Sequence, residues 1–157
     1  MLTNRGAKTL ADASELIEWY RTRWEIEFFF NVLKNGCEVE ELQLSAMDRL
    51  ERAVALFMVV AWRIAYLMRK GRTCPDLDAS LFFDPDEIRA AYLLNKKKPP
   101  VAPSMNEVLR MVARVGGFLA RKHDGEPGVK AIWRGLQDAQ VSAQTIRTLR
   151  EMGALQS

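Results

Sequence analysis

The sequence is poor in the side chains that bind transition metals or form disulfides. Among 157 residues it has two cysteines and one histidine. Cys37 and Cys74 are not spaced as metal ligands, and adding His123 does not complete a zinc site. Two isolated cysteines also make no disulfide framework, which fits a protein of the reducing cytoplasm. We therefore expect neither a zinc centre nor a disulfide-stapled fold.

The sequence also lacks the apolar segments that export and membrane insertion require. Residues 1–9 have no apolar centre of an export signal, and Met1–Asn4 are compatible instead with the end of a strand. The most apolar stretch, Ala53–Met68, contains Arg63 and is shorter than the roughly 20 residues of a membrane span. We expect a core helix there, with Arg63 at its edge or paired with a carboxylate.

A large excess of charge of either sign is missing too. The net charge of +3 is too small by itself to indicate nucleic-acid binding. No compact basic recognition helix stands out, so a helix-turn-helix regulator is the least favoured class. The basic run Lys96–Lys98 precedes Pro99 and Pro100 in an extended linker. We expect it to be solvated, and contact with DNA phosphates is the minority alternative.

Helix signals divide the chain and predict a mainly α fold, a helical bundle of about four to five helices. Capping patterns mark helix starts at Thr9–Asp12, Asp84–Glu87 and Ser104–Glu107. The expected helices cover about 12–35 with Gly36 as the stop, about 45–70, 84–94, 104 onward, and about 129–152. Gly116 and Gly117 lie in or at the end of the fourth helix and permit close approach of another backbone.

The first expected helix carries a stripe of hydrogen-bonding side chains on an otherwise apolar cylinder. At about 100° per residue, the stripe falls within one arc of roughly 60° and consists of Tyr20, Arg23, Glu27 and Lys34. Such an apolar helix is typically buried, and buried charges need partners or a cleft. The simplest interpretation is a surface pair of Arg23 and Glu27, with Lys34 solvated nearby.

The intervals between these four residues support a more specific interpretation. The spacing resembles the signature of DDE-type bacterial cut-and-paste transposases of the insertion-sequence-four group, in which two residues separate Tyr from Arg, three separate Arg from Glu, and six separate Glu from Lys. A second set of motifs resembles the C-terminal part of the same transposases: Gly116-Gly117-Phe118, Arg121-Lys122, Asp124-Gly125-Glu126-Pro127-Gly128 and Ile132-Trp133-Arg134-Gly135. Together the resemblance spans about Leu2 to Ala139.

The resemblance implies an RNase H-like catalytic domain. In such a domain two aspartates of a mixed sheet and one glutamate of a helix hold two divalent cations, Mg²⁺ or Mn²⁺, for phosphoryl transfer. It assigns Glu27 to the catalytic, metal-binding glutamate, and Tyr20, Arg23 and Lys34 to the transposon-end DNA, chiefly its phosphates. The chemistry agrees, since a carboxylate suits a hard cation and Arg and Lys suit phosphate oxygens.

The chain departs from this family pattern in one respect. Upstream of Glu27 the only aspartate is Asp12, on the same helix, and one carboxylate cannot hold a two-metal centre. We therefore expect a C-terminal fragment of a DNA transposase that is inactive alone and binds no metal. Residues 1–36 would be the remnant of the RNase H-like catalytic domain, and residues 37–157 the helical C-terminal region that pairs subunits.

The same resemblance predicts partners. The full-length protein would bind transposon-end DNA. This chain would form a homodimer, because the apolar face of its first helix lacks the sheet on which it would pack. The expected location is the bacterial cytoplasm, away from membranes. The alternative function is a non-catalytic helical interaction module, one that pairs with full-length transposase and inhibits transposition.

Overall fold

The computed structural model describes residues 4–154, so the strand end predicted at Met1–Asn4 lies, apart from Asn4, outside the described residues. The described chain contains five α-helices: α1 (Leu10–Asn31), α2 (Met47–Thr73), α3 (Pro85–Leu94), α4 (Met105–Val115) and α5 (Val129–Glu151). Shorter helical turns are η1 (Val32–Gly36, a π-helix), η2 (Val39–Glu41) and η3 (Ala79–Leu81). Between residues 4 and 154 there is no strand, only an isolated bridge between Asp78 and Ser104. The mainly α prediction is confirmed.

Three helices start at the capping patterns that the sequence contains. Reciprocal side-chain and backbone hydrogen bonds join Thr9 to Asp12 at α1, Asp84 to Glu87 at α3, and Ser104 to Glu107 at α4. In α3, Pro85 also occupies the first turn, where its missing N–H costs nothing. These local contacts satisfy backbone N–H groups that a helix start leaves without partners.

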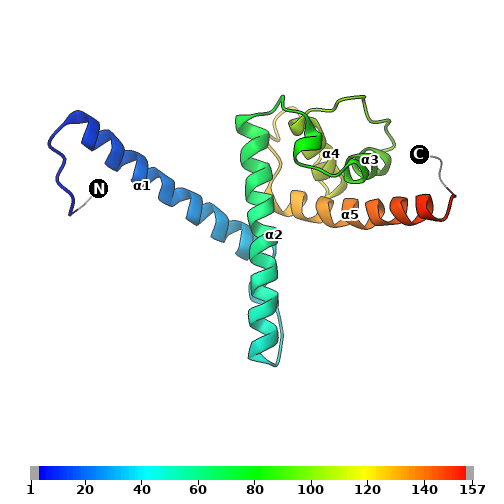
Figure 1. Ribbon diagram of the computed structural model, residues 1–157, viewed down its shortest axis with the longest axis horizontal. Coiled ribbons are helices and arrows are strands. Elements are labelled where there is room, and N and C mark those ends of the chain that lie inside the picture. Colours follow the sequence, from blue (N-terminus) through cyan, green and yellow to red (C-terminus); the bar gives the residue numbers. More distant parts are fainter. Residues whose placement is uncertain (1–3, 155–157) are drawn as a thin grey trace.

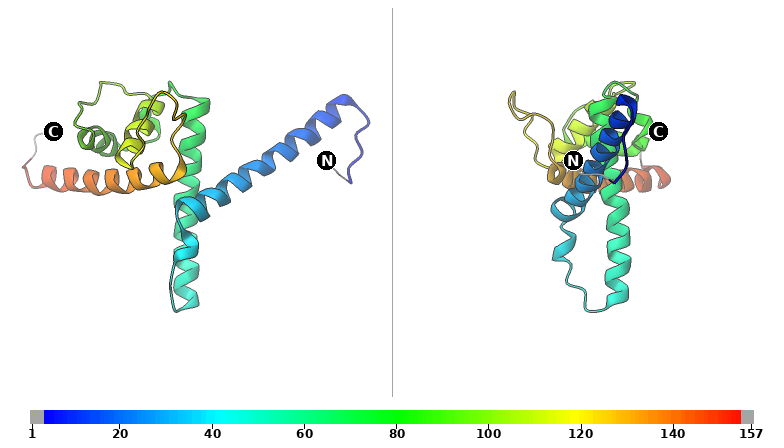
Figure 2. Two further views of the ribbon diagram at one scale, coloured as in Figure 1. Left: turned by 180° about the vertical axis from the view of Figure 1, so that it is seen from behind. Right: turned by 90° about the vertical axis from the view of Figure 1, so that its left-hand side faces the viewer.

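The helices form a projecting arm and a bundle. Figure 1 shows α1 leaving the middle of α2 and running away from the other helices, while α3, α4 and α5 lie together on the other side of α2. In both views of Figure 2 the first turns of α2 are accompanied only by the segment that joins α2 to α1. The start of α1 and the end of α5 lie on opposite sides of the molecule.

One continuous core holds the bundle together and reaches the end of α1. Its largest fully buried side chains come from α2, α4, α5 and the π-helical turn: Ile64, Leu67, Met105, Val108, Val112, Ile132 and Val32. In contrast, α1 itself buries no residue, and only Phe28 and Phe29 near its end pack partly against the core. The burial that is typical of such an apolar helix is therefore absent from α1 in this chain, whose first turns bury no side chain.

The backbones of α4 and α5 approach each other closely. A Cβ atom on Gly135 would lie 1.8 Å from the carbonyl oxygen of Val112, and one on Gly116 would lie 1.9 Å from that of Ala131. No side chain other than hydrogen fits either gap, so backbone packs directly on backbone. The close approach predicted at Gly116 is therefore present, and Gly135 supplies its other half.

Two predicted helix ends need correction. The first helical run does reach Gly36, but it changes to a π-helix after Asn31, where the Val32 N–H points to the carbonyls of both Phe28 and Phe29. The second helix starts after Ala46 rather than Ser45 and continues through Gly71 to Thr73. Tertiary contacts explain the extension, since Asn106 donates a hydrogen bond of 3.0 Å to the Gly71 carbonyl.

The length and composition of the described helices bear on whether any of them could span a membrane. None of those between residues 4 and 154 is long and apolar enough to cross a bilayer. Arg63, which interrupts the most apolar stretch, is paired with a carboxylate as predicted.

Candidate functional site

The four stripe residues are all exposed on the arm. Tyr20, Arg23 and Glu27 are exposed on α1, and Lys34 is exposed on the π-helical turn that continues it. The Arg23 guanidinium lies over the Tyr20 ring, 5.4 Å from its centroid. Among the described residues no ion pair joins Arg23 to Glu27, so the simple surface pair is absent and the Arg23 charge is directed to an aromatic face.

Glu27 and Lys34 line one hollow on the arm. Together with Phe30, Asn31 and Asn35 they surround a space of about 510 Å³. Lys34 also forms an ion pair of 2.9 Å with Glu40, and the Lys34 side chain is 55% exposed. Such exposed pairs are weak and easily exchanged. The structure thus leaves both Glu27 and Lys34 accessible to a ligand from solvent.

A single carboxylate does not make a metal centre here. Within residues 4–154 no group of three or more His, Cys, Asp or Glu side chains gathers to hold a metal ion. A pair of divalent cations needs several oxygen ligands held close together. The residues that this chain supplies around Glu27 therefore do not fit a complete two-metal site, and the chemistry of such a site cannot come from these residues alone.

Beside the stripe, α1 and α2 form an apolar groove. It encloses about 460 Å³ and is lined by Glu25, Ile26, Phe28, Phe29, Phe30, Trp62, Ala65, Tyr66 and Arg69. Trp62 and Tyr66 stack along it with ring centroids 5.2 Å apart, and an ion pair of 2.8 Å between Arg69 and Glu25 crosses between the two helices. Exposed apolar surface of this kind is typical of interaction sites.

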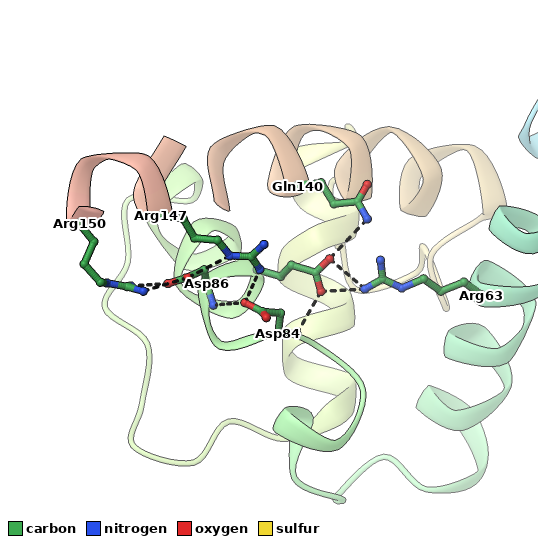
Figure 3. Close-up of polar contacts among 7 residues, drawn as sticks. Arg63, Asp84, Asp86, Gln140, Arg147 and Arg150 are labelled. Atoms are coloured by element: carbon green, nitrogen blue, oxygen red, sulfur yellow. Dashed lines mark hydrogen bonds and ion pairs between the residues drawn. The ribbon is translucent and has the colours of Figure 1, made fainter. Parts of the chain in front are cut away.

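A second polar cluster joins α3 to both α2 and α5, and Figure 3 shows its side chains converging on the first turn of α3. Glu87 accepts two hydrogen bonds from Arg63 of α2, at 2.9 and 2.7 Å, and one of 3.5 Å from Gln140 of α5. The same carboxylate accepts the N–H of Asp84 at the start of its own helix. One buried glutamate therefore ties three helices together.

Two arginines of α5 meet two aspartates at the start of α3, the N-cap Asp84 and Asp86, in the same cluster (Figure 3). Arg150 contacts both oxygens of Asp86, at 2.5 and 3.1 Å. Arg147 bridges the pair, with its Nε atom 3.3 Å from Asp86 and its terminal nitrogen 2.8 Å from Asp84. The Asp86 side chain is only 9% exposed, so its charge depends on these two partners.

The arginines also set the acidity of the aspartates. Hydrogen bonding to Arg150 holds the pKa of Asp86 below its usual value, against the opposing effect of burial. Hydrogen bonding to Arg147, and to the backbone N–H of Asp86, does the same for the pKa of Asp84. Both carboxylates are therefore charged at neutral pH.

Sequence reasoning found half of this cluster. It identified Asp84–Glu87 as a helix start and expected a carboxylate partner for Arg63, but it assigned nothing to Arg147 and Arg150. Their spacing of three residues places them on one face of α5, which was the available signal. The sequence contained no indication that this face would meet α3.

An exposed helix with the Tyr-Arg-Glu-Lys stripe, followed by a helical bundle, is consistent with a piece of a DDE transposase. Family models agree with this class. Residues 59–154, more than half of the chain, match the Transposase Tn5 dimerisation domain, and residues 3–62 match the Transposase DDE domain. The chain belongs to the Tn5 transposase dimerisation domain family.

These matches confirm the predicted transposase resemblance and function class. The DDE match ends within α2, where the dimerisation match begins, so the long helix is common to both. A DDE domain implies the use of divalent metal by the full-length transposase, and a dimerisation domain implies self-association and a role with DNA. The roles of individual residues stay predictions.

Proposed function

We propose that this chain supplies three parts of a DNA transposase: its catalytic glutamate, contacts to transposon-end phosphates, and the surface that pairs subunits. The observation that carries the proposal is the exposed row of Tyr20, Arg23, Glu27 and Lys34 within the segment that matches the DDE domain. We place the division between catalytic remnant and pairing region at residues 36 and 37, and expect the protein in the bacterial cytoplasm.

Glu27 would act only together with aspartates that this chain does not place near it. When Mg²⁺ or Mn²⁺ is bound in the full-length protein, the metal would activate the attacking oxygen and stabilise the leaving one. Glu27 suits a ligand role because it is an exposed carboxylate at the rim of a hollow. By itself the chain would not cleave DNA.

Arg23, Lys34 and Tyr20 would hold the DNA backbone beside Glu27. A guanidinium and an ammonium both bind phosphate oxygens, and the Tyr20 hydroxyl can donate to phosphate or its ring can pack on sugar. Arg23 already lies over the Tyr20 ring, so the two side chains would approach one segment of backbone together. We expect these contacts to fix position rather than to read sequence.

Cleavage of a labelled transposon-end duplex with Mg²⁺ or Mn²⁺ tests the catalytic role. The comparison is between this chain, a longer protein in which the strands of the DDE domain precede it, and the longer protein with Glu27→Ala. We expect cleavage only by the longer wild type. Glu15→Ala is the matched control, because Glu15 is an exposed carboxylate on the same helix. Normal cleavage by the Glu27→Ala protein would refute the assignment.

Salt-dependent DNA binding by the longer protein tests the phosphate contacts. Losing one phosphate contact should lower the slope of log affinity against log salt by about one. We expect that change for Arg23→Ala and Lys34→Ala. Arg21→Ala serves as the control, since Arg21 is an exposed arginine of α1 that pairs with Glu18. Equal slopes for all three variants would mean that Arg23 and Lys34 do not contact DNA phosphates.

Sedimentation velocity over a wide concentration range tests subunit pairing by this chain. We expect a homodimer that dissociates on dilution. A monodisperse monomer at every concentration would contradict the pairing role.

A further inference from the structure

We propose that Asn31 is a further DNA-binding residue of the arm, whose side-chain amide donates a hydrogen bond to a backbone phosphate beside Glu27. Asn35 would be its positioning residue, because it fixes the orientation of that amide. This inference rests on the proposed function, and it adds one neutral contact to the charged contacts of Arg23 and Lys34.

Asn31 lies on the face of the arm that carries the stripe. It is the last residue of α1 and follows Glu27 by four residues. The rise and turn of an α-helix place it about 6 Å beyond Glu27 along the axis and about 40° round it. Asn31 is exposed, and it lines the same hollow as Glu27 and Lys34. A ligand that enters this hollow therefore meets the amide as well as the carboxylate and the ammonium.

The amide of Asn31 is held in one orientation. Asn35 donates from its Nδ2 atom to the Oδ1 atom of Asn31, at 2.6 Å. Among residues 4–154 the Nδ2 atom of Asn31 makes no hydrogen bond. The side chain of Asn31 therefore offers chiefly an N–H donor, which suits a phosphate oxygen better than a metal cation.

The π-helical turn holds Asn35 where this contact requires it. Asn35 belongs to η1, in which the N–H of Cys37 donates to the carbonyl of Val32 five residues earlier, at 2.9 Å. Turns of this kind are rare and are frequent at functional sites. Val32 and Leu33 anchor the turn in the core, while Asn35 stays exposed. The amide pair is thus attached to a fixed base at the edge of the hollow.

A neutral donor differs from a cation in its effect on salt dependence. A cation that binds phosphate displaces counterions, so its loss lowers the slope of log affinity against log salt by about one. An amide displaces no counterion. Loss of Asn31 should therefore weaken DNA binding by the same factor at every salt concentration, unlike loss of Arg23 or Lys34.

Fluorescence anisotropy of a labelled transposon-end duplex with the longer protein, over a range of salt concentrations, tests the proposal. For Asn31→Ala we expect an affinity about tenfold lower with an unchanged slope, as for the loss of a hydrogen bond to a charged group. Asn35→Ala should give a smaller loss, because the amide remains but is no longer oriented. Asn31→Lys should keep or raise the affinity and steepen the slope by about one, because it brings a cation to the same phosphate.

Thr22 supplies the matched controls. It is a neutral, exposed residue of α1, about 140° round the helix from Glu27. Its hydroxyl donates to the carbonyl of Trp19 in the same helix, at 2.7 Å. Neither Thr22→Ala nor Thr22→Lys should change the affinity or the slope.

The outcomes separate this inference from the proposed function beneath it. If Arg23→Ala and Lys34→Ala change the slope but Asn31→Ala binds as the wild type does, this inference alone is overturned. It is also overturned if Thr22→Ala weakens binding as much as Asn31→Ala, or if Asn31→Lys leaves the slope unchanged. A loss with Asn31→Ala while Arg23→Ala and Lys34→Ala keep the wild-type slope overturns only the proposed charged contacts. Wild-type binding by all three alanine variants overturns both.

Discussion

Burial controls the chemistry of Cys37, which is 6% exposed and lies next to the π-helical turn. Loss of solvation raises the pKa of its thiol to about 11. Because the thiolate is the reactive form, Cys37 should be inert near neutral pH. Cys74 is only half-buried, at the end of α2.

We therefore expect iodoacetamide at pH 8 to modify Cys74 first, and Cys37 only after unfolding in denaturant. Mass spectrometry of the intact chain would show one adduct in the native state and two in the unfolded state. In Cys74→Ser the native chain should remain unmodified over the same time. Rapid modification of Cys37 in that variant would mean that this part of the core opens readily.

The crossing of α4 and α5 leaves no room for a larger side chain at its two glycines. Gly135→Ala would place a Cβ 1.8 Å from a backbone oxygen of α4, which cannot move as a side-chain tip can. We expect a loss of about 3 kcal/mol in the free energy of unfolding, because two helices must separate. Urea denaturation followed by circular dichroism measures it.

Gly6→Ala is the matched control for that substitution. Nothing lies within 4 Å of a Cβ at Gly6, in the exposed segment before α1. Its effect should stay within about 0.5 kcal/mol, as for most surface positions. Equal effects of the two substitutions would contradict direct backbone packing at the crossing.

The contact between α3 and α5 should weaken in acid. The folded chain lowers the pKa of Asp84 and of Asp86. Each therefore contributes stability that is complete above the ordinary aspartate pKa near ~4, and that is lost as the pH falls through the lowered value. We expect the urea midpoint to decline below about pH 4, and to decline less steeply in Asp86→Asn. Parallel declines in both proteins would assign the acid sensitivity to other carboxylates.

The arm, α1, exposes several large apolar side chains to solvent. Trp24 is 62% exposed and Ile26 is 57% exposed on a helix that buries nothing, beside the aromatic groove with α2. An exposed apolar face of this size should bind the dye ANS and promote association. That a sheet of the full-length protein would cover this face stays a prediction.

We expect Trp24→Ser with Ile26→Ser to lower ANS fluorescence at least about twofold and to change the free energy of unfolding by less than about 0.5 kcal/mol, since neither residue is buried. Val108→Ala is the contrasting variant. It should lower the free energy of unfolding but leave ANS binding by the native state unchanged, because Val108 is buried. A large loss of stability on removing Trp24 and Ile26 would show that the arm packs on something in solution.

Local signals were enough to predict the helices and the stripe. The capping boxes at Thr9, Asp84 and Ser104 are set by side chains three residues apart, and the stripe follows from the helical period. Non-local contacts were not predictable in this way. Lys34 meets Glu40 only because the chain turns after Gly36, and α2 continues through Gly71 because α4 packs there.

The sequence by itself determined the helix starts, the mainly α class, the transposase resemblance and the spacing of Tyr20, Arg23, Glu27 and Lys34. These depend on residues a few positions apart, whose relative places a helix fixes. Only the tertiary structure decided that α1 projects without burial, that Gly116 and Gly135 meet, and that Asp86 receives Arg147 and Arg150. Such contacts join residues far apart in the chain, and their formation depends on the packing of whole helices rather than on local geometry.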